Sequence, residues 1–277
     1  MKLPLLTFAA VGAMAAYAIP QAPLITYGMV RDEYGNPLKG SSALSLNLVR
    51  ADAPNGQVYA ATSVGEMAYP GMNYRLSLEI DSSGPQRPYA VLEGTEMKIK
   101  FLIDGEEQAV TPSPVFAVPA NGTAQRKDYS LGSDADGDGL PDAWEAWVLS
   151  IDGRPYDAAA IAAFRPGDDA DGDGMSNVRE FLAGTDPFLA TDLFTITHFA
   201  KKGEGLRAEI RFTTVPGRTY RVVTSATLND PTWVPAATTR VADGVPAYET
   251  YVGTGRDITL YIDAPSEDSA FFKVAAQ

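Results

Sequence analysis

Two acidic segments in the middle of the 277-residue chain place oxygen-bearing side chains at the same spacing. In each segment Asp stands at positions 1, 3 and 5, Gly at position 6, Asp or Asn at position 9, and Glu at position 12. The first segment runs from Asp134 to Glu145 and the second from Asp169 to Glu180. Calcium takes six to eight hard oxygen ligands, and a tightly turned loop can wrap such a set around one ion. The spacing therefore predicts two calcium ions.

The expected ligands are the side chains at positions 1, 3, 5, 9 and 12 and the main-chain carbonyl at position 7. They are Asp134, Asp136, Asp138, Leu140, Asp142 and Glu145 in the first loop, and Asp169, Asp171, Asp173, Met175, Asn177 and Glu180 in the second. Gly139 and Gly174 permit the sharp turn at position 6. Without a cation the clustered carboxylates would repel one another, so we expect the calcium-free loops to loosen. Magnesium is a poorer candidate, because its small octahedral shell needs fewer protein oxygens.

An amphipathic pattern follows each loop, which a merely solvated acidic turn would not require. One apolar stripe, on a helix that begins near Pro141, consists of Trp144, Trp147, Val148 and Ile151. The same spacing returns, on a helix that Gly184 ends, at Met175, Val178, Phe181 and Leu182. A short helix is predicted between them over residues 158–164, before Pro166 and Gly167. These stripes predict a small helical core in which the tryptophans are packing anchors.

Residues 134–187 resemble the calcium-binding repeats of the thrombospondin type 3 and dockerin kinds, and residues 177–187 resemble a repeat ending that is common in secreted bacterial proteins. Each loop is also similar to an EF-hand loop. Position 8, however, is Pro141 in the first loop and Ser176 in the second, where paired EF-hands have an apolar residue whose N–H helps to join the loops. Unlike dockerin loops, these lie 35 residues apart and end in Glu. The resemblance implies structural calcium binding rather than signalling or cohesin binding.

The flanking parts of the chain predict β structure, because short runs with alternating apolar residues are separated by turn residues. We expect a mainly β protein with two β-sandwich (Ig-like) domains, residues 19–132 and 193–277, joined by a small helical segment at residues 133–192 that carries the calcium loops. Residues 28–40 resemble the first hairpin of carboxypeptidase-regulatory-like and other Ig-like modules. Residues 215–222 resemble a β module that often ends large secreted bacterial proteins. The prolines between residues 112 and 119 predict a domain edge or a run of extended chain.

The N-terminus predicts a signal peptide over residues 1–18. Lys2 precedes an apolar run over residues 3–16, and Ala16-Tyr17-Ala18 forms a small-x-small cleavage site. The run is shorter than the roughly 20 residues that a bilayer span needs. We therefore expect a secreted protein, extracellular or at the cell surface, with the periplasm as an alternative and no membrane span after cleavage.

Charge and composition exclude several chemistries. The formal net charge is −13, and most of it falls between residues 134 and 192, so nucleic acid and anionic membranes are poor partners. The chain has no cysteine, which excludes disulfides, thiolate catalysis and Cys-ligated zinc. Its only histidine, His198, stands in a strand-like segment and has no catalytic motif around it.

The leading functional hypothesis is a non-enzymatic surface or extracellular protein in which calcium rigidifies the connection between two β domains for a structural or adhesive role. Its partner could be a glycan, another surface protein or a second copy of the chain. A calcium-dependent carbohydrate-binding module is an alternative, with exposed tyrosines on one β face stacking on sugars. A filament or surface-layer subunit is another. A glycan-active hydrolase is less favoured, because most acidic residues already belong to the calcium loops.

Overall fold

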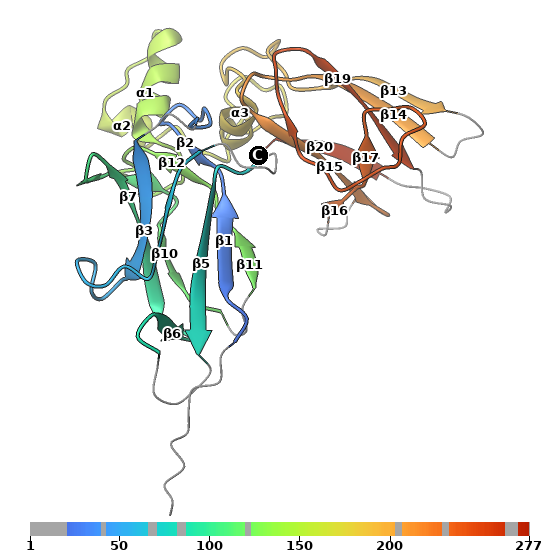
Figure 1. Cartoon of the computed structure of the whole chain (residues 1–277). Helices are drawn as coiled ribbons and strands as arrows, with labels where there is room; N and C mark the ends of the chain where they lie inside the picture. Colours follow the sequence, from blue (N-terminus) through green and yellow to red (C-terminus); the bar gives the residue numbers. More distant parts are fainter. Residues whose placement is uncertain are drawn as a thin grey trace, which may run out of the picture.

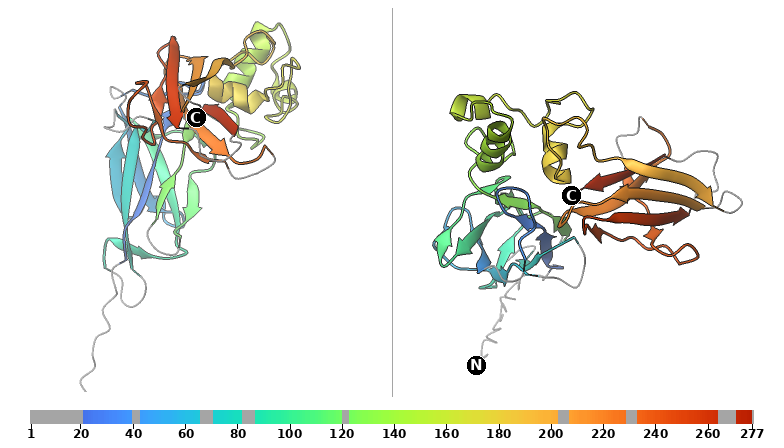
Figure 2. Two further views of the ribbon diagram at one scale, coloured as in Figure 1. Left: turned by 90° about the vertical axis from the view of Figure 1, so that its right-hand side faces the viewer. Right: turned by 90° about the horizontal axis from the view of Figure 1, so that it is seen from above.

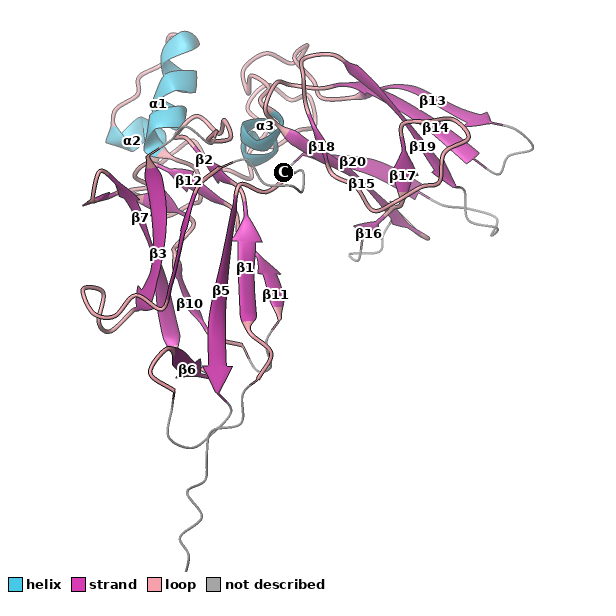
Figure 3. Cartoon of the chain, in the orientation of Figure 1, coloured by secondary structure: helices cyan, strands magenta, loops and turns pink. Residues whose placement is uncertain are grey.

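The chain forms two β regions with a short helical segment between them (Figures 1 and 3). The computed structural model describes residues 21–39, 43–65, 71–81, 87–119, 123–202, 207–228, 233–263 and 271–276. The predicted signal peptide, residues 1–18, lies outside the described residues. No helix in the described part of the chain is long and apolar enough to cross a membrane.

The described residues between 21 and 131 form twelve strands of the N-terminal β region. They are β1 (Leu24–Gly28), β2 (Val30–Arg31), β3 (Leu44–Arg50), β4 (Ala60–Ser63), β5 (Tyr74–Asp81), β6 (Ala90–Leu92), β7 (Glu96–Ile103), β8 (Glu106–Glu107), β9 (Val110–Thr111), β10 (Val115–Ala117), β11 (Ala124–Arg126) and β12 (Tyr129–Leu131). The proline-rich segment after residue 111 does not end the region, because β10, β11 and β12 pair with earlier strands.

One hydrophobic core serves both of the larger sheets in this region. The sheet orders are β11-β1-β5-β6 and β10-β7-β3-β4, and a small third sheet has the order β2-β12-β9. Leu24 and Leu76 from the first sheet and Leu46 and Ile99 from the second belong to the same buried cluster. Alternate residues of β5 and β7 point into it, as their alternating sequences predict. The third sheet ends at the first acidic loop and so fixes where that loop starts.

The helical segment contains α1 (Asp142–Ile151), α2 (Ala158–Ile161) and α3 (Asn177–Ala183). As predicted, α1 begins after Pro141, and Gly184 ends α3 with a left-handed backbone at φ 79°. The predicted stripe on α1 is only half buried. Trp144 and Val148 lie in the helical core, whereas Trp147 and Ile151 are 48% and 52% exposed. The spacing correctly placed them on one face, but the neighbouring elements cover only part of it.

The C-terminal β region, residues 196–276, forms two further sheets. Its strands are β13 (Ile196–Lys202), β14 (Arg207–Thr213), β15 (Thr219–Ser225), β16 (Val234–Pro235), β17 (Thr238–Thr239), β18 (Tyr251–Val252), β19 (Asp257–Asp263) and β20 (Phe271–Ala276). One sheet has the order β13-β14-β19-β17, and in the other β15 pairs with β16, β18 and β20. Phe212 and Tyr220, one from each sheet, are fully buried in one cluster. His198 on β13 lies near Glu209, with Nε2 3.6 Å from Oε1.

The fold is thus mainly β, with the short helices next to the acidic loops, as the sequence predicts. The segment before β19 contributes only the two-residue strand β18, Tyr251–Val252. The Ig-like sandwich topology and the domain boundaries stay predictions. Two further views show the helical segment beside both β regions, with α3 next to the C-terminal strand (Figure 2).

Candidate calcium sites

The first acidic loop gathers three carboxylates around one point. Oxygens of Asp134, Asp136 and Asp138 lie within 4.8 Å of one another. Oδ1 of Asp134 accepts hydrogen bonds from the backbone N–H of Gly137 at 2.7 Å, and Oδ2 accepts one from Gly139 at 3.0 Å. Gly139 has φ +101°, a conformation that other residues rarely adopt. The Asp–Gly alternation therefore closes the loop and brings the three carboxylates together.

The second loop repeats this geometry. Oxygens of Asp169, Asp171 and Asp173 again lie within 4.8 Å of one another. Oδ1 and Oδ2 of Asp169 accept hydrogen bonds from the N–H groups of Gly172 at 2.8 Å and Gly174 at 2.9 Å. The same residue types at positions 1, 4 and 6 therefore form the same hydrogen-bonded turn in both loops.

The two glutamates at position 12 are fully buried, each on the first turn of its helix. Both carboxylate oxygens of Glu145, and Oε2 of Glu180, have no hydrogen-bond partner among the described residues. Burial raises the pKa of Glu145 to about 9, and the carboxylates of Asp138 and Asp136 add to the rise. Burial also raises the pKa of Glu180 to about 8, with Asp171 and Asp173 adding to it. Buried carboxylates without partners are costly, and a cation would satisfy them. The residues present therefore fit calcium.

Position 9 differs between the loops. In the first loop, both carboxylate oxygens of Asp142 already accept hydrogen bonds from nearby residues. Its Oδ2 accepts one from Ser133 Oγ at 2.7 Å, and its Oδ1 accepts one from Ala135 N at 2.9 Å. In the second, Asn177 is fully buried, and its Nδ2 donates to the carbonyl of Arg165 at 2.7 Å. Its Oδ1 has no partner among the described residues. The carbonyl ligands expected of Leu140 and Met175 stay predictions.

A shared aromatic core connects the two loops. Trp144 directly precedes Glu145, and Phe181 directly follows Glu180. Their rings meet edge to face with centroids 5.0 Å apart, and Phe164 packs on the same tryptophan at 5.9 Å. Each position-12 glutamate therefore neighbours a side chain that packs against the helix of the other loop. Met175 precedes α3 instead of lying in it, and it is not part of this core.

The first loop is also bound to the N-terminal β region through a residue that sequence reasoning missed. Thr111 on β9 is buried, and its Oγ1 donates to Oδ2 of Asp134 at 2.7 Å. Gly132 lies against Glu33 and Pro141, so a side chain there would be crowded. Nothing near Thr111 in the sequence marks this contact, because the partner stands 23 residues later.

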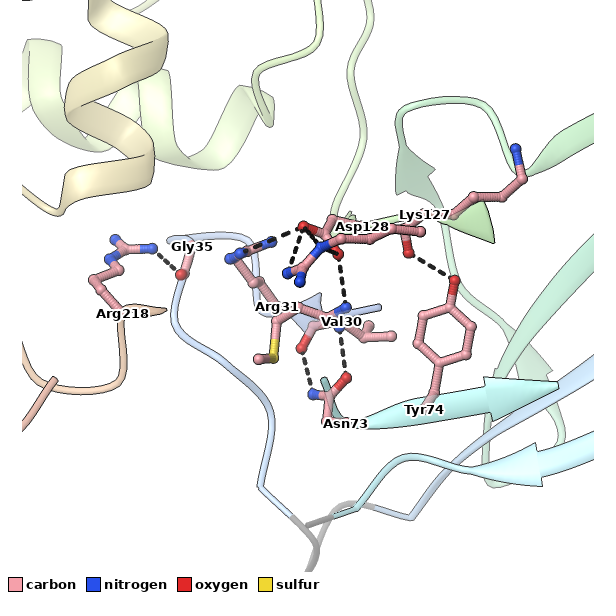
Figure 4. A network of polar contacts seen from close by, with 10 residues as sticks. Val30, Arg31, Gly35, Asn73, Tyr74, Lys127, Asp128 and Arg218 are labelled. Atoms are coloured by element: carbon pink, nitrogen blue, oxygen red, sulfur yellow. Dashed lines mark hydrogen bonds and ion pairs between the residues drawn. The ribbon is translucent and has the colours of Figure 1, made fainter. Parts of the chain in front are cut away.

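A second missed residue, Arg218, lies where the two β regions meet α3 (Figure 4). Its side chain is 4% exposed. Nη1 donates to the carbonyl of Gly35, Nη2 donates to that of Tyr34 at 3.3 Å, and the guanidinium carbon lies 5.9 Å from the centre of the Phe181 ring. A Cβ on Gly184 would lie 2.8 Å from Nε. We call Gly35, Phe181, Gly184 and Arg218 the three-way joint.

The turn that receives Arg218 is braced from within the N-terminal β region (Figure 4). Asn73 accepts from Val30 N at 2.7 Å and donates to the carbonyl of the same residue at 2.8 Å. Asp128 accepts from Met29 N at 2.9 Å and lies 4.0 Å from the buried guanidinium of Arg31. Burial, with the positive charge of Arg31, lowers the pKa of Arg218 to about 10. The carbonyls of the turn therefore solvate a buried cation that has no ion pair with a carboxylate among the described residues.

Three of the seven tyrosines considered for a sugar-binding β face lie in the hydrophobic cores. Tyr74, Tyr220 and Tyr251 are buried. Tyr89 and Tyr248 are exposed, one in each β region, and Tyr69 lies outside the described residues. The exposed Tyr89 and Tyr248 therefore lie in different β regions.

The comparisons with known proteins agree with the loop geometry. The family model of the bacterial TSP3 repeat matches residues 134–146 and 169–190, which are the two loops and the chain that directly follows them. No curated protein and no solved structure matches the chain. Residues 134–146 and 169–190 are bacterial TSP3 repeats, and their two Asp triads could bind calcium.

Proposed function

We propose that this protein is a secreted, non-enzymatic surface or extracellular protein in which two calcium ions hold two β regions in a fixed relation. The observation that carries the proposal is the position of α3. This helix begins in the second acidic loop, and its Phe181 reaches the three-way joint, where both β regions meet.

The first loop supports the proposal from the N-terminal side. The hydrogen bond from Thr111 to Asp134 joins the loop to β9, and α1 follows directly after position 8. An ion held by this loop would draw Glu145 towards the Asp triad and fix the first turn of α1. The helical core would then be fastened to the N-terminal β region.

The second loop supports it from the C-terminal side. Met175 and Leu182 line a cavity of about 340 Å³ together with Val274 and Ala276 of β20. The ring centre of Phe181, on the same helix, lies 5.9 Å from the guanidinium carbon of Arg218, and the ring lies close to Gly35. An ion held between Asp169 and Glu180 would therefore order the helix against which both β regions pack.

The two β regions are also in direct contact. Calcium would therefore stabilise an existing interface between them, not a free linker. Gly71 lies against Thr250, and Gly217 lies against Pro37. A Cβ at Gly71 would come within 2.6 Å of the threonine side chain. Close backbone approach of this kind favours one defined arrangement.

Bound calcium supplies positive charge to carboxylates that would otherwise repel one another. Ligand binding to the folded state alone stabilises that state by mass action, so millimolar extracellular calcium would keep even weak sites filled. Bacterial TSP3 repeats are typically extracellular, which supports secretion. A structural or adhesive role follows from this reasoning, with a filament or surface-layer subunit as a variant of it.

The test is to measure the interdomain relation of residues 19–277 with and without calcium. A donor and an acceptor dye are attached at Ser63→Cys and Thr213→Cys, one in each β region, in a chain that has no other cysteine. We expect one narrow transfer-efficiency peak with calcium and a broad distribution after chelation. Small-angle scattering on the unlabelled protein should report the same compaction.

Two variants locate the effect. Glu180→Gln should leave the distribution broad in calcium, and Arg218→Ala should broaden it while calcium still binds to the first loop. Glu93→Gln, an exposed glutamate far from the loops in sequence, is the matched control. An unchanged narrow peak after chelation would contradict the proposal, as would the absence of calcium binding by calorimetry at millimolar calcium.

A further inference from the structure

A pocket of about 520 Å³ opens beside the three-way joint, and all three parts of the chain build it. Its walls come from the turn of the N-terminal β region, from α1, from the segment after α3 and from the turn between β14 and β15. The lining includes Tyr34, Trp147, Gly184, Asp186, Asp192 and Arg218. The volume falls in the range of small-ligand sites, which occur preferentially at domain interfaces.

Two aromatic rings stand exposed at this pocket. Trp147 is 48% exposed and Tyr34 is 41% exposed, and their ring centroids lie 6.2 Å apart at an angle of 77°. Trp144, one turn earlier on α1, already anchors the helical core. Trp147 is not part of that core; its ring packs edge to face on Tyr34 and stays 48% exposed where it lines the pocket.

Carboxylate oxygens lie beyond the rings. Asp186 uses Oδ1 to accept from Phe188 N at 3.0 Å, and Asp192 uses Oδ2 to accept from Asp186 N at 3.0 Å. These bonds fix both side chains and leave one oxygen of each without a partner in the described part of the chain. Asp192 is exposed, so its remaining oxygen can accept hydrogen bonds from a ligand.

The floor of the pocket is cationic. Arg218 is 4% exposed, and its Nε has no hydrogen-bond partner among the described residues. It faces the space that a side chain at Gly184 would fill. The two aspartates disfavour an anionic ligand, the buried guanidinium disfavours a cationic one, and the net charge of −13 opposes polyanions generally.

We propose that this pocket binds one neutral sugar ring of a polysaccharide. The apolar C–H face of a pyranose would lie on Trp147 or Tyr34, and its hydroxyl groups would donate to Asp186 and Asp192. Because the walls belong to all three parts of the chain, binding requires the assembled joint. The calcium dependence of this site rests on the proposed function. Its preference for a neutral sugar rests only on the residues that line the pocket.

The test is calorimetry and affinity electrophoresis of calcium-loaded residues 19–277 on soluble neutral polysaccharides, namely glucan, mannan, xylan and galactan, with alginate as the anionic comparison. We expect one neutral polysaccharide to bind and chelation to abolish the binding. Trp147→Ala should weaken it at least tenfold. Ile151→Ala is the matched control, because this residue is 52% exposed on the same helix and does not line the pocket.

The possible outcomes separate the sugar site from the calcium function. If calcium binds and narrows the interdomain distribution but none of the four neutral polysaccharides binds, the sugar site is refuted while the calcium function stands. Equal binding by Trp147→Ala and the wild type, or a preference for alginate, also overturns the proposal. If the interdomain distribution stays narrow after chelation and the sugar still binds, while Trp147→Ala abolishes that binding, the sugar site stands and the calcium function falls. Unchanged melting of the Trp147→Ala protein establishes that the variant folds.

Discussion

Replacing Glu145 by Gln should make the calcium-free protein more stable, although it removes a proposed ligand. Burial and the neighbouring carboxylates raise the pKa of Glu145 from 4.5 to about 9. Between these values the calcium-free folded state holds a proton that the unfolded chain has released. The free energy of unfolding therefore falls as pH rises through this window. At pH 7 the difference reaches about 3 kcal/mol at about 1.4 kcal/mol per unit of pKa. The expected loosening of the calcium-free loop admits water to the carboxylate and reduces the difference to about 2 kcal/mol.

Urea unfolding of chelated protein, followed by tryptophan fluorescence, measures this difference. Two of the three tryptophans, Trp144 and Trp147, lie on α1 and so report on the segment that contains Glu145. We expect the wild type and Glu145→Gln to unfold alike near pH 4.5, and the variant to gain about 2 kcal/mol at pH 7. In saturating calcium the order should reverse, because only the wild type presents both carboxylate oxygens. Glu93→Gln, at an exposed position, should change neither result.

A variant that is destabilised equally at pH 4.5 and pH 7 without calcium would refute the reasoning. It would mean that Glu145 matters through its shape in the core and not through its charge. An equal gain in stability from calcium in both proteins would refute its role as a ligand.

Three further outcomes follow from the same geometry. Thr111→Ala should weaken calcium binding at the first loop about fivefold, or about 1 kcal/mol, because Asp134 loses its hydrogen bond to β9. Thr111→Ser should restore the affinity measured by calorimetry, and equal affinity in all three proteins would count against the contact. Gly35→Ala should lower the free energy of unfolding in urea by about 1–3 kcal/mol more than Gly94→Ala does. Both glycines have φ near +80°, but only at Gly35 would the added methyl group clash with Arg218 and Phe181. Equal losses of stability would argue against close packing at the joint. Calcium binding should release protons at pH 7, because both loop glutamates have raised pKa values; calorimetric heats that do not depend on the ionisation enthalpy of the buffer would contradict this.

The sequence alone determined the two acidic loops and the helices after them. All the expected ligands of one site stand within twelve consecutive residues, so their spacing already specifies the turn that gathers them. The same holds for the helix ends, where Pro141 and Gly184 act through their own backbone conformations. Strands with clean alternation, such as residues 74–80 and 97–103, were also predictable, because each buries one face.

Only the tertiary structure decided how the loops connect to the rest of the molecule. Arg218 meets Gly35 across 183 residues, and no local pattern marks either as a partner of the other. Trp147 and Trp144 have the same periodicity, yet only Trp144 is buried, because burial depends on which elements pack against the helix. The short strands β8 to β12 have too few residues for a pattern and exist through their pairing partners. Periodicity specifies a face, whereas contacts between distant segments specify what covers it.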